Sequence, residues 1–490
     1  MSNSYVFGII MARIFENNST MKQKDFVKKA KCSSYLKNKT ASFVLLLFFL
    51  FAGNALVAQE TWSLNRCVSF AIENNIGLKK MQVQEQMAGE NLKQAKRNLL
   101  PGLSASSSAN YSFGRSIDPN TNDYVNTAFF NNSYELGASV TVFNASNQIY
   151  MIEYQKFRKK ASELNRLSAT DDLAFLVMNS YFEVVYQQGL LEIAGEQVKA
   201  SAINLKRMEK MVELGMKSKT DLLEIRANYE SEELKRIQVE NALKTARISL
   251  KQRMNHNAAD EIVPDNLNSP LVGSAQPDQQ SLFASYLKWS PYFQSYETQF
   301  QSAKKYISVS RSQLLPYISA YGGMSTGFYE TTKDDNGKVI AFGKQFNNNL
   351  SQYLGASINI PIFNRMATRS GITKAKLELD QARLTMDEEK QKLYFEMVNN
   401  LNEIEALEKE YNQYLHQQEA DQQAYHAAEV KFEQGLVNVV DFYIAKNRLA
   451  NTEAQLLKAR LFWEVKKNII EFYNGKRFWE APSDPPVGGE

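Results

Sequence analysis

Two aspartates, each placed six positions after a glycine, are the residues best placed to do chemistry in this chain. Asp221 follows Gly215 and Asp441 follows Gly435, and a long helical pattern runs into each glycine. Glycine supplies the left-handed residue that ends a helix, and aspartate favours the start of the next helix. Both segments therefore predict the tip of a helical hairpin. Capping of the second helix, worth about 1 kcal/mol, is the simplest role for either aspartate.

Residues with the chemistry of an enzyme are few. His416 and His426 lie ten residues apart on a predicted helix, and no third metal ligand is nearby. The sequence contains no recognisable nucleophile motif or phosphate-binding loop. We therefore expect no catalytic residue, no metal site and no cofactor, and we interpret the two histidines as solvated helix residues.

The two hairpin tips belong to a unit that occurs twice. Segments about 220 residues apart match in the same order, and a repeat of this kind takes precedence over a domain count from length. The matching segments are the Leu-Leu-Pro triplets that end at Pro101 and Pro316, the segments that end at Asn144 and at Pro361-Ile362-Phe363-Asn364, and the tips at 214–221 and 434–441. We expect one repeat over residues 59–270, a second over 271–474, and a C-terminal tail over 475–490.

The first 58 residues have the features of a leader. Lys37 and Lys39 precede an apolar run over residues 43–58 that is too short for a membrane helix and suits a signal peptide. We place the cleavage between Ala58 and Gln59, and retention of the run as a membrane anchor is the alternative. The leader holds eight of the 57 basic residues and two of the 53 acidic ones. The remaining chain is slightly acidic and has no basic stripe that would bind nucleic acid.

Four segments alternate with the two-residue period of β-strands. They cover residues 102–114, 133–143, 316–328 and 350–360, and in each an apolar face opposes a face of small polar residues. Their length suits strands that cross a membrane. Soluble hairpins with one wet face are the alternative.

The helical patterns are unusually long. Residues 145–213 and 366–434 run without a proline, and residues 219–255 and 438–474 form returning arms. Apolar residues in steps of three and four predict coiled-coil-like packing, and a helix of this length spans about 100 Å.

Four strands cannot close a barrel, and an open sheet edge in lipid leaves unpaired backbone groups. Other copies of the chain must therefore complete the sheet. Two copies would give eight strands and three would give twelve, and small inward side chains favour the larger barrel with a water channel. The expected fold is thus mainly α with a transmembrane β part: long helical hairpins form an α-barrel joined to a β-barrel that a homotrimer completes.

The chain resembles the TolC-type outer membrane efflux family over residues 60–475. The features that carry this resemblance are the duplicated half, the Leu-Leu-Pro strand entries, the exit at Pro361 and the glycine-to-aspartate tips. The resemblance implies a homotrimeric duct in the outer membrane that extends into the periplasm. It also implies an adaptor (membrane fusion) protein in the periplasm and an inner-membrane pump as partners, and efflux or type I secretion as the function.

In this family an aspartate of the second tip faces the pore, and Asp441 matches it. A second ring aspartate matches Ile444, which would form an apolar collar. The family's first-tip aspartate matches Asp221, whose Arg and Tyr partners match Val437 and Phe432 here. The resemblance therefore implies a pore aperture at Asp441 and Ile444, without the family's salt-bridge latch.

Two other functions compete with the export duct. A structural coiled-coil protein of the periplasm would explain the helices but not the four alternating strands. An adaptor anchored by its leader would leave the strands equally unexplained. Fractionation separates the three, since only the duct belongs in the outer membrane.

Overall fold

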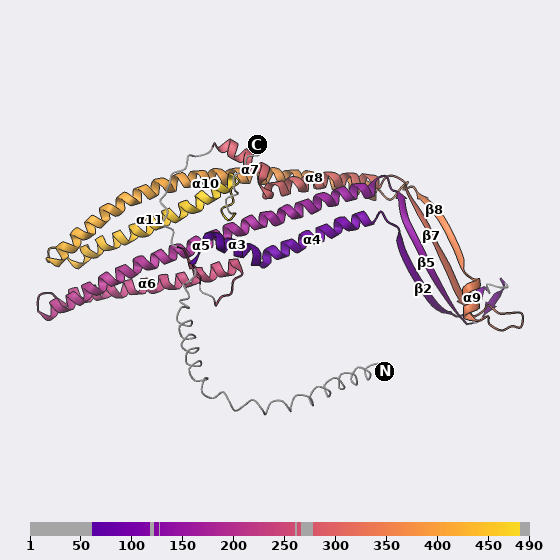
Figure 1. Ribbon diagram of the computed structural model, residues 1–490, viewed down its shortest axis with the longest axis horizontal. Coiled ribbons are helices and arrows are strands. Elements are labelled where there is room, and N and C mark those ends of the chain that lie inside the picture. The colour runs from indigo at the N-terminus through magenta and orange to yellow at the C-terminus, as the bar shows by residue number, and fades with distance from the viewer. Residues whose placement is uncertain (1–60, 118–121, 127, 260–261, 266–277, 481–490) are drawn as a thin grey trace, which may run out of the picture. The chain divides into compact units, whose positions relative to one another are not determined.

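The computed structural model describes residues 61–117, 122–126, 128–259, 262–265 and 278–480. The predicted leader over residues 1–58 and its cleavage site lie outside these ranges. Within them, the four predicted strands form one antiparallel sheet in the order β2-β5-β7-β8 (Figure 1). The strands are β2 (Gly102–Ser112), β5 (Phe129–Phe143), β7 (Tyr317–Tyr329) and β8 (Ser351–Asn359). The second strand begins four residues before its predicted start at 133.

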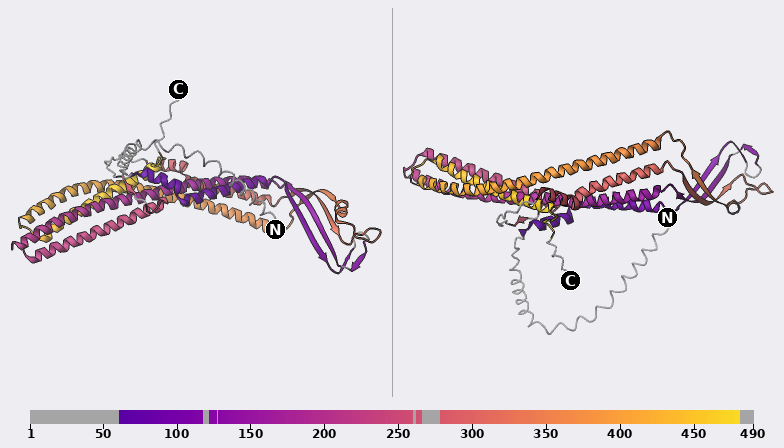
Figure 2. Two further views of the ribbon diagram at one scale, coloured as in Figure 1. Left: turned by 60° about the horizontal axis from the view of Figure 1, so that its bottom comes forward. Right: turned by 90° about the horizontal axis from the view of Figure 1, so that it is seen from above.

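Two helical hairpins carry most of the chain. The first joins α5 (Asn147–Glu213) to α6 (Lys219–Met254), and the second joins α10 (Ala367–Glu433) to α11 (Val439–Tyr473). Helices α5 and α10 have 67 residues each. The hairpins contact each other mainly through α5 and α11, so the order near the tips is α6-α5-α11-α10 (Figure 2).

The helix that leads into each repeat's first strand is interrupted. The sequence predicts one helix over 63–97, but α3 (Leu64–Asn74) and α4 (Ile76–Arg97) are separated at Asn75. Asn75 is extended (φ −65°, ψ 124°), and its side chain accepts a hydrogen bond from Leu78 N and so caps α4. An asparagine that can cap a new helix competes with continuation of the old one.

The second repeat has the same interruption. Here α7 (Gln279–Trp289) and α8 (Pro291–Ser312) are separated at Ser290, and the proline occupies the first position of α8. Helix α4 packs on α5, and α8 packs on both α5 and α10. The helices next to the sheet therefore follow the order α4-α5-α8-α10, which is the order of the strands that they join.

The segments between the strands contain additional elements. Between β2 and β5, β3 (Arg115–Ile117) pairs with β4 (Tyr124–Asn126). Between β7 and β8 lies a short helix, α9 (Phe342–Asn348), whose Gln345 is 2% exposed and hydrogen bonds the backbone N–H and carbonyl of Tyr329. Gln345 thus satisfies the part of β7 that extends beyond β8.

The largest core lies where α3, α5, α6, α7, α10 and α11 meet. Part of the predicted tail belongs to it, since Trp479 is buried and Arg477 binds Asp171 of α5 through two contacts, of 2.9 and 3.3 Å. Two short strands, β1 (Thr61–Trp62) and β6 (Val263–Pro264), pair in parallel at the margin of this region. Residues 475–480 are therefore packed structure, while 481–490 lie outside the described ranges.

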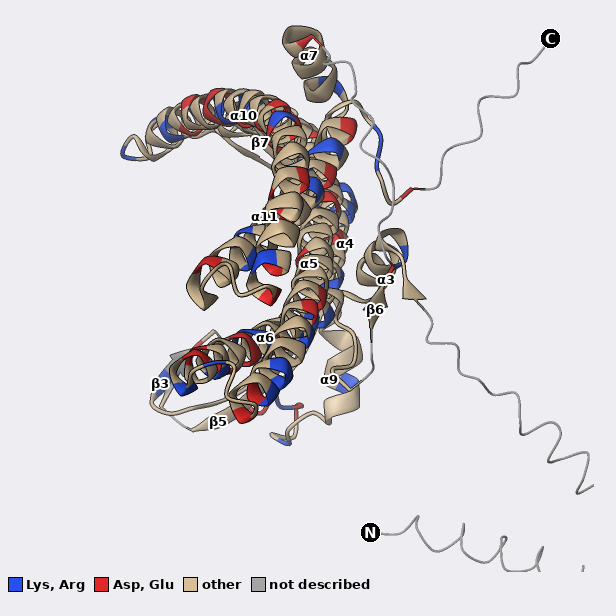
Figure 3. Ribbon diagram, turned by 90° about the vertical axis from the view of Figure 1, so that its left-hand side faces the viewer, with Lys and Arg blue, Asp and Glu red and all other residues tan. Residues whose placement is uncertain are grey.

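Charged side chains of both signs are interspersed along the helices (Figure 3). Among the residues that the structure describes, no helix has the length and apolarity needed to cross a membrane.

Candidate functional site

The two hairpin tips have the same backbone. Gly215 and Gly435 are left-handed, with φ of +73° and +75°. In the first tip Gly215 N donates to Val212 O and Met216 N to Met211 O, and the second tip repeats both bonds with Phe432 O and Lys431 O as acceptors. This double bonding satisfies the last carbonyls of a helix that ends in a left-handed glycine. Both glycines therefore end their helices as predicted.

The residues that cap α6 and α11 are not the aspartates. Ser218 Oγ accepts from Asp221 N at 3.1 Å, and Asn438 Oδ1 accepts from Asp441 N at 2.8 Å. Capping, the simplest role for Asp221 and Asp441, therefore belongs to Ser218 and Asn438 instead. Each aspartate is the third helical residue, where its charge still favours the positive end of the helix. Its carboxylate is not needed as the cap.

A buried apolar cluster lies at the second tip. Phe432 stacks on Phe442 with ring centroids 4.9 Å apart, and Val437 packs against the same group. Met208 of α5 and Ile225 of α6 complete the cluster from the first hairpin. Phe432 and Val437, which stand where the family has Tyr and Arg, therefore help to hold the two tips together by apolar packing.

Asp441 and Ile444 share an exposed side of α11, whereas Phe442 and Tyr443 between them are buried. Ile444 is 59% exposed. Asp221 on the first tip is half-buried. A Cβ built on Gly435 would lie 3.8 Å from Lys217 Nζ, which places a cation of the first tip beside the second turn.

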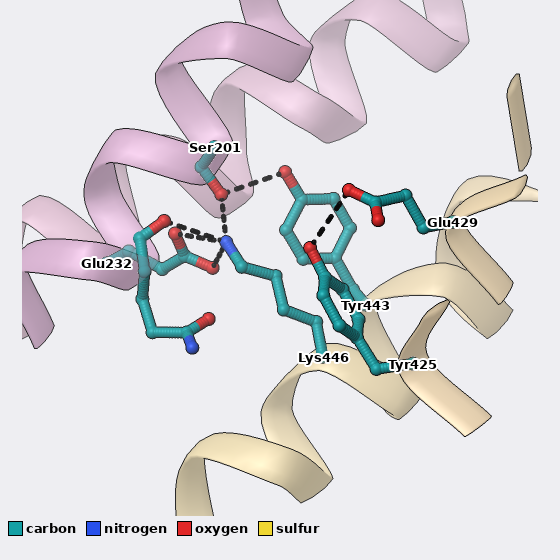
Figure 4. Close-up of polar contacts among 7 residues, drawn as sticks. Ser201, Glu232, Tyr425, Glu429, Tyr443 and Lys446 are labelled. Carbon is teal, nitrogen blue, oxygen red and sulfur yellow. Dashed lines mark hydrogen bonds and ion pairs between the residues drawn. The ribbon is translucent and has the colours of Figure 1, made fainter. Parts of the chain in front are cut away.

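A buried lysine joins the two hairpins above the tips (Figure 4). Lys446 of α11 is 1% exposed. Its Nζ donates to Ser201 Oγ at 2.5 Å and to Gln197 O at 2.8 Å, both on α5, and to the Glu232 carboxylate of α6 at 2.9 and 3.0 Å. Burial lowers the pKa of Lys446, and Glu232 opposes that effect. The contact holds one helix of the second hairpin against both helices of the first.

Neighbouring polar contacts extend this junction. Tyr443 OH lies 3.3 Å from Ser201 Oγ, and Arg207 of α5 pairs with Glu433 at the end of α10. Sequence reasoning missed Lys446 and Glu232. The available signal was the spacing of Lys446, which lies four residues after Phe442 and three before Leu449 and so shares an otherwise apolar face of α11 with them.

The predicted strand-boundary prolines lie at the junctions between helix and sheet. Pro101 precedes β2, Pro316 precedes β7, and Pro361 follows the end of β8 by two residues. Both strand-to-helix exits then use two consecutive left-handed residues that are not glycine, namely Ala145 and Ser146, and Arg365 and Met366, with φ between +51° and +64°. No sequence signal predicts these four residues, because residues other than glycine rarely adopt this conformation.

No group of three or more metal-ligating side chains occurs among the described residues. His426 Nδ1 lies 3.7 Å from Glu429 of the same helix, one turn away.

The sequence matches the outer membrane efflux protein family over residues 67–256 and 282–472. The chain belongs to this family. The two matched stretches correspond to the two repeats, each with its own hairpin tip.

Curated relatives agree with this assignment. The outer membrane protein TolC of Vibrio cholerae serotype O1 is 22% identical over 436 residues, which cover 85% of this chain and 92% of TolC. The proteases secretion protein PrtF of Dickeya chrysanthemi is 20% identical and matches 72% of this chain and 73% of its own length. Among solved structures, the CmeC outer membrane channel of Campylobacter jejuni superposes with a TM-score of 0.72 at 18% identity, covering 85% of this chain and 87% of CmeC.

The fold is therefore that of the TolC-like channels, with helical hairpins that form an α-barrel and strands that form a β-barrel. The protein is an outer membrane duct for efflux or secretion. The family and its structural relatives are channels and not enzymes.

Proposed function

We propose that three copies of this chain assemble into one duct. The unpaired edges of its four-stranded sheet support this proposal. Among the described strands, β2 pairs only with β5 and β8 only with β7, so each leaves one edge open. An open edge in lipid is costly because its N–H and carbonyl groups have no partner. Three copies would supply twelve strands, which is enough for a barrel with a water-filled interior.

The helices flanking the sheet support the same assembly. Helices α4 and α10 end the order α4-α5-α8-α10, as β2 and β8 end the sheet. Both carry exposed apolar side chains separated by four, seven or eleven residues, which places them on one face of each helix, as in a helix that packs on another helix. On α4 these are Ile76, Val83 and Met87, and on α10 they are Leu377, Leu384 and Phe395. Contact between α4 of one copy and α10 of the next would cover both rows.

The narrowest point of the duct is proposed at the second tip. Asp441 and Ile444 lie on an exposed side of α11, whereas the opposite side packs into the buried apolar cluster at the second tip. In the trimer this side would face the pore, so that three carboxylates form a ring favouring cations, with three isoleucines as an apolar collar. Asp221, which is half-buried, would have only a supporting role.

The partners proposed are a periplasmic adaptor and an inner-membrane pump. The proteases secretion protein PrtF and the outer membrane channel CmeC among the relatives support a tripartite assembly of this kind. The exposed Leu214, Met216 and Leu436 at the turns offer apolar contacts to an adaptor.

Single-channel recording of the purified protein in planar bilayers tests the proposal. Wild-type protein should give a small, cation-preferring conductance, and Asp441→Ala should lower the cation-to-anion permeability ratio several-fold. The matched control is Asp221→Ala, which should leave this ratio near the wild-type value. Absence of channels from folded, trimer-sized protein would contradict the proposed duct. Equal effects of the two mutations would show that Asp441 does not line the aperture.

A further inference from the structure

One residue supplies all the charge of the four-stranded sheet. Strands β2, β5, β7 and β8 contain no Asp, Glu, Lys or Arg other than Glu135 in the middle of β5. A charge within a membrane-spanning sheet is costly on the lipid side and is tolerated on a wet interior. The position of Glu135 therefore requires a functional or structural reason.

The strand register shows which face Glu135 occupies. Glu135 pairs with Ser106 of β2 and with Ser325 of β7, and side chains of directly paired residues share a face. This face otherwise carries mainly Ser, Gly, Asn, Thr and Tyr. The opposite face carries Leu103, Leu136, Met324, Leu354 and Ile358. The apolar face suits lipid, so Glu135 belongs to the face that lines the interior.

A tyrosine two strands away holds the carboxylate. Tyr353 of β8 donates its hydroxyl hydrogen to Glu135 Oε1 at 2.8 Å, and it must cross β7 to do so. The crossing point is Gly323, where an added Cβ would lie 2.8 Å from the Tyr353 hydroxyl, and Gly137 beside it leaves 3.6 Å. Any larger residue at 323 would push the ring away from Glu135.

A second tyrosine lies across the sheet in the same way. Tyr321 of β7 covers Gly355 of β8, where an added Cβ would lie 2.7 Å from the ring, and its centroid is 6.3 Å from that of Tyr353. Both tyrosines remain about two-fifths exposed. Together with Glu135 they form a cluster that projects from the polar face, because the neighbouring residues on this face are mainly Ser and Gly.

We propose that Glu135, positioned by Tyr353, is a second cation-selecting site of the duct, located within the sheet and separate from the tip. The inference rests on the proposed trimer, in which three copies of Glu135 would form a ring of carboxylates around the interior. Rings of acidic side chains favour cations in channels. The ligands are inorganic cations and cationic substrates, which the tyrosine faces would also contact.

The test is the cation-to-anion permeability ratio, obtained from reversal potentials in a potassium chloride gradient across planar bilayers. Glu135→Gln should lower the ratio about threefold, since it removes the charge of one ring and keeps the shape. Tyr353→Phe keeps the carboxylate and the aromatic ring but removes the donor, so we expect a smaller decrease, of about 1.5-fold. Asp335→Asn, which removes an exposed carboxylate from the turn after β7, is the matched control and should leave the ratio unchanged.

All three substitutions are also measured in an Asp441→Asn background, so that selection at the tip does not mask selection in the sheet. An unchanged ratio for Glu135→Gln in both backgrounds, from channels of normal conductance, overturns the inference and leaves the duct intact. An equal decrease for Asp335→Asn also overturns it, because the effect would then be one of general surface charge. Absence of channels in the wild type would instead contradict the proposed function itself.

Discussion

The two hairpins of this protein have nearly identical backbones but bury different side chains. Residues 220 positions apart are equivalent from the start of α5 and α10 to beyond their tips, and both turns use the same glycine bonds and the same capping position. In the second hairpin Lys446 is buried at the junction. Its equivalent, Arg226, is exposed and pairs with Glu209 of its own hairpin at 3.0 Å.

The same divergence appears beside it. Phe442 is fully buried, whereas its equivalent Leu222 is only partly buried, and the exposed Ile444 corresponds to Glu224. Duplication has therefore preserved the residues that determine the backbone, while the residues that face the other hairpin or the exterior have changed. At the tips, four of the six buried residues of the apolar cluster come from the second hairpin, namely Phe432, Val439, Phe442 and Tyr443.

The largest expected contrast between the two hairpins comes from the buried cation. Lys446→Ala leaves the Glu232 carboxylate, whose side chain is only 15% exposed, without its cation and should reduce the free energy of unfolding of the tip region by about 3 kcal/mol. Arg226→Ala removes an exposed ion pair and should cost less than about 1 kcal/mol. Native-state hydrogen exchange of the tip peptides measures both.

A paired substitution checks the cause. Lys446→Met combined with Glu232→Gln should recover most of the loss, because no buried charge then lacks a partner. If the double variant is no more stable than Lys446→Ala, the ion pair is not what holds the hairpins together.

The aromatic stack gives the next largest contrast. Phe442→Ala removes a fully buried ring that stacks on Phe432, and we expect a loss of about 3–4 kcal/mol. Leu222→Ala at the equivalent position should cost about 1–2 kcal/mol, since this side chain is only partly buried. The same exchange experiment applies, and equal losses would show that both tips are packed alike.

A third contrast concerns pH. Burial raises the pKa of Asp171 from about 3.8 to about 6, although Arg477 acts in the opposite direction. The folded state then favours the protonated carboxyl. The resulting stabilisation is complete below about pH 4 and is lost as the pH rises through 6, by up to about 3 kcal/mol. The equivalent residue of α10, Gln391, is exposed and cannot titrate.

Thermal unfolding of wild type and Asp171→Asn between pH 4 and 7.5 measures this effect. The melting temperature of the wild type relative to the variant should fall across that range. A difference that rises with pH would mean that the Arg477 contact outweighs burial.

The smallest effects should be equal in the two hairpins. Ser218→Ala and Asn438→Ala each remove one cap and should cost about 1 kcal/mol at their own tip. Hydrogen exchange in the first turn of α6 and of α11 reports the loss. A twofold or larger difference would show that the common backbone does not imply common energetics.

Much of the fold was predictable from the sequence, because its signals are local. Two-residue alternation located the four strands, sustained steps of three and four located the long helices, and Gly215 and Gly435 marked the turns. The family assignment followed from the repetition of these signals. The choice of cap was not recovered, since Ser218 and Asn438 were overlooked in favour of the nearby aspartates.

The remaining features depend on distant contacts. Lys446 is a surface-type residue by composition, and only the approach of α5 and α6 supplies its acceptors. Asn75 ends α3 within a continuous helical pattern, and its amide reaches Arg253 O, 178 residues away. Arg477 likewise acquires its partner only when the end of the chain returns to α5. No window of sequence contains these pairs.

The unbroken length of α5 and α10 has a mechanical consequence. Each is a single rod of 67 residues, about 100 Å long, whose neighbours change along the way. Helix α5 has α8 beside it near the sheet and α11 beside it near the tip, whereas α4 and α8 stop at Asn75 and Ser290. A torque applied at a tip is therefore carried toward the sheet by two continuous helices per chain, because α5 and α10 run unbroken from the tips to the strands.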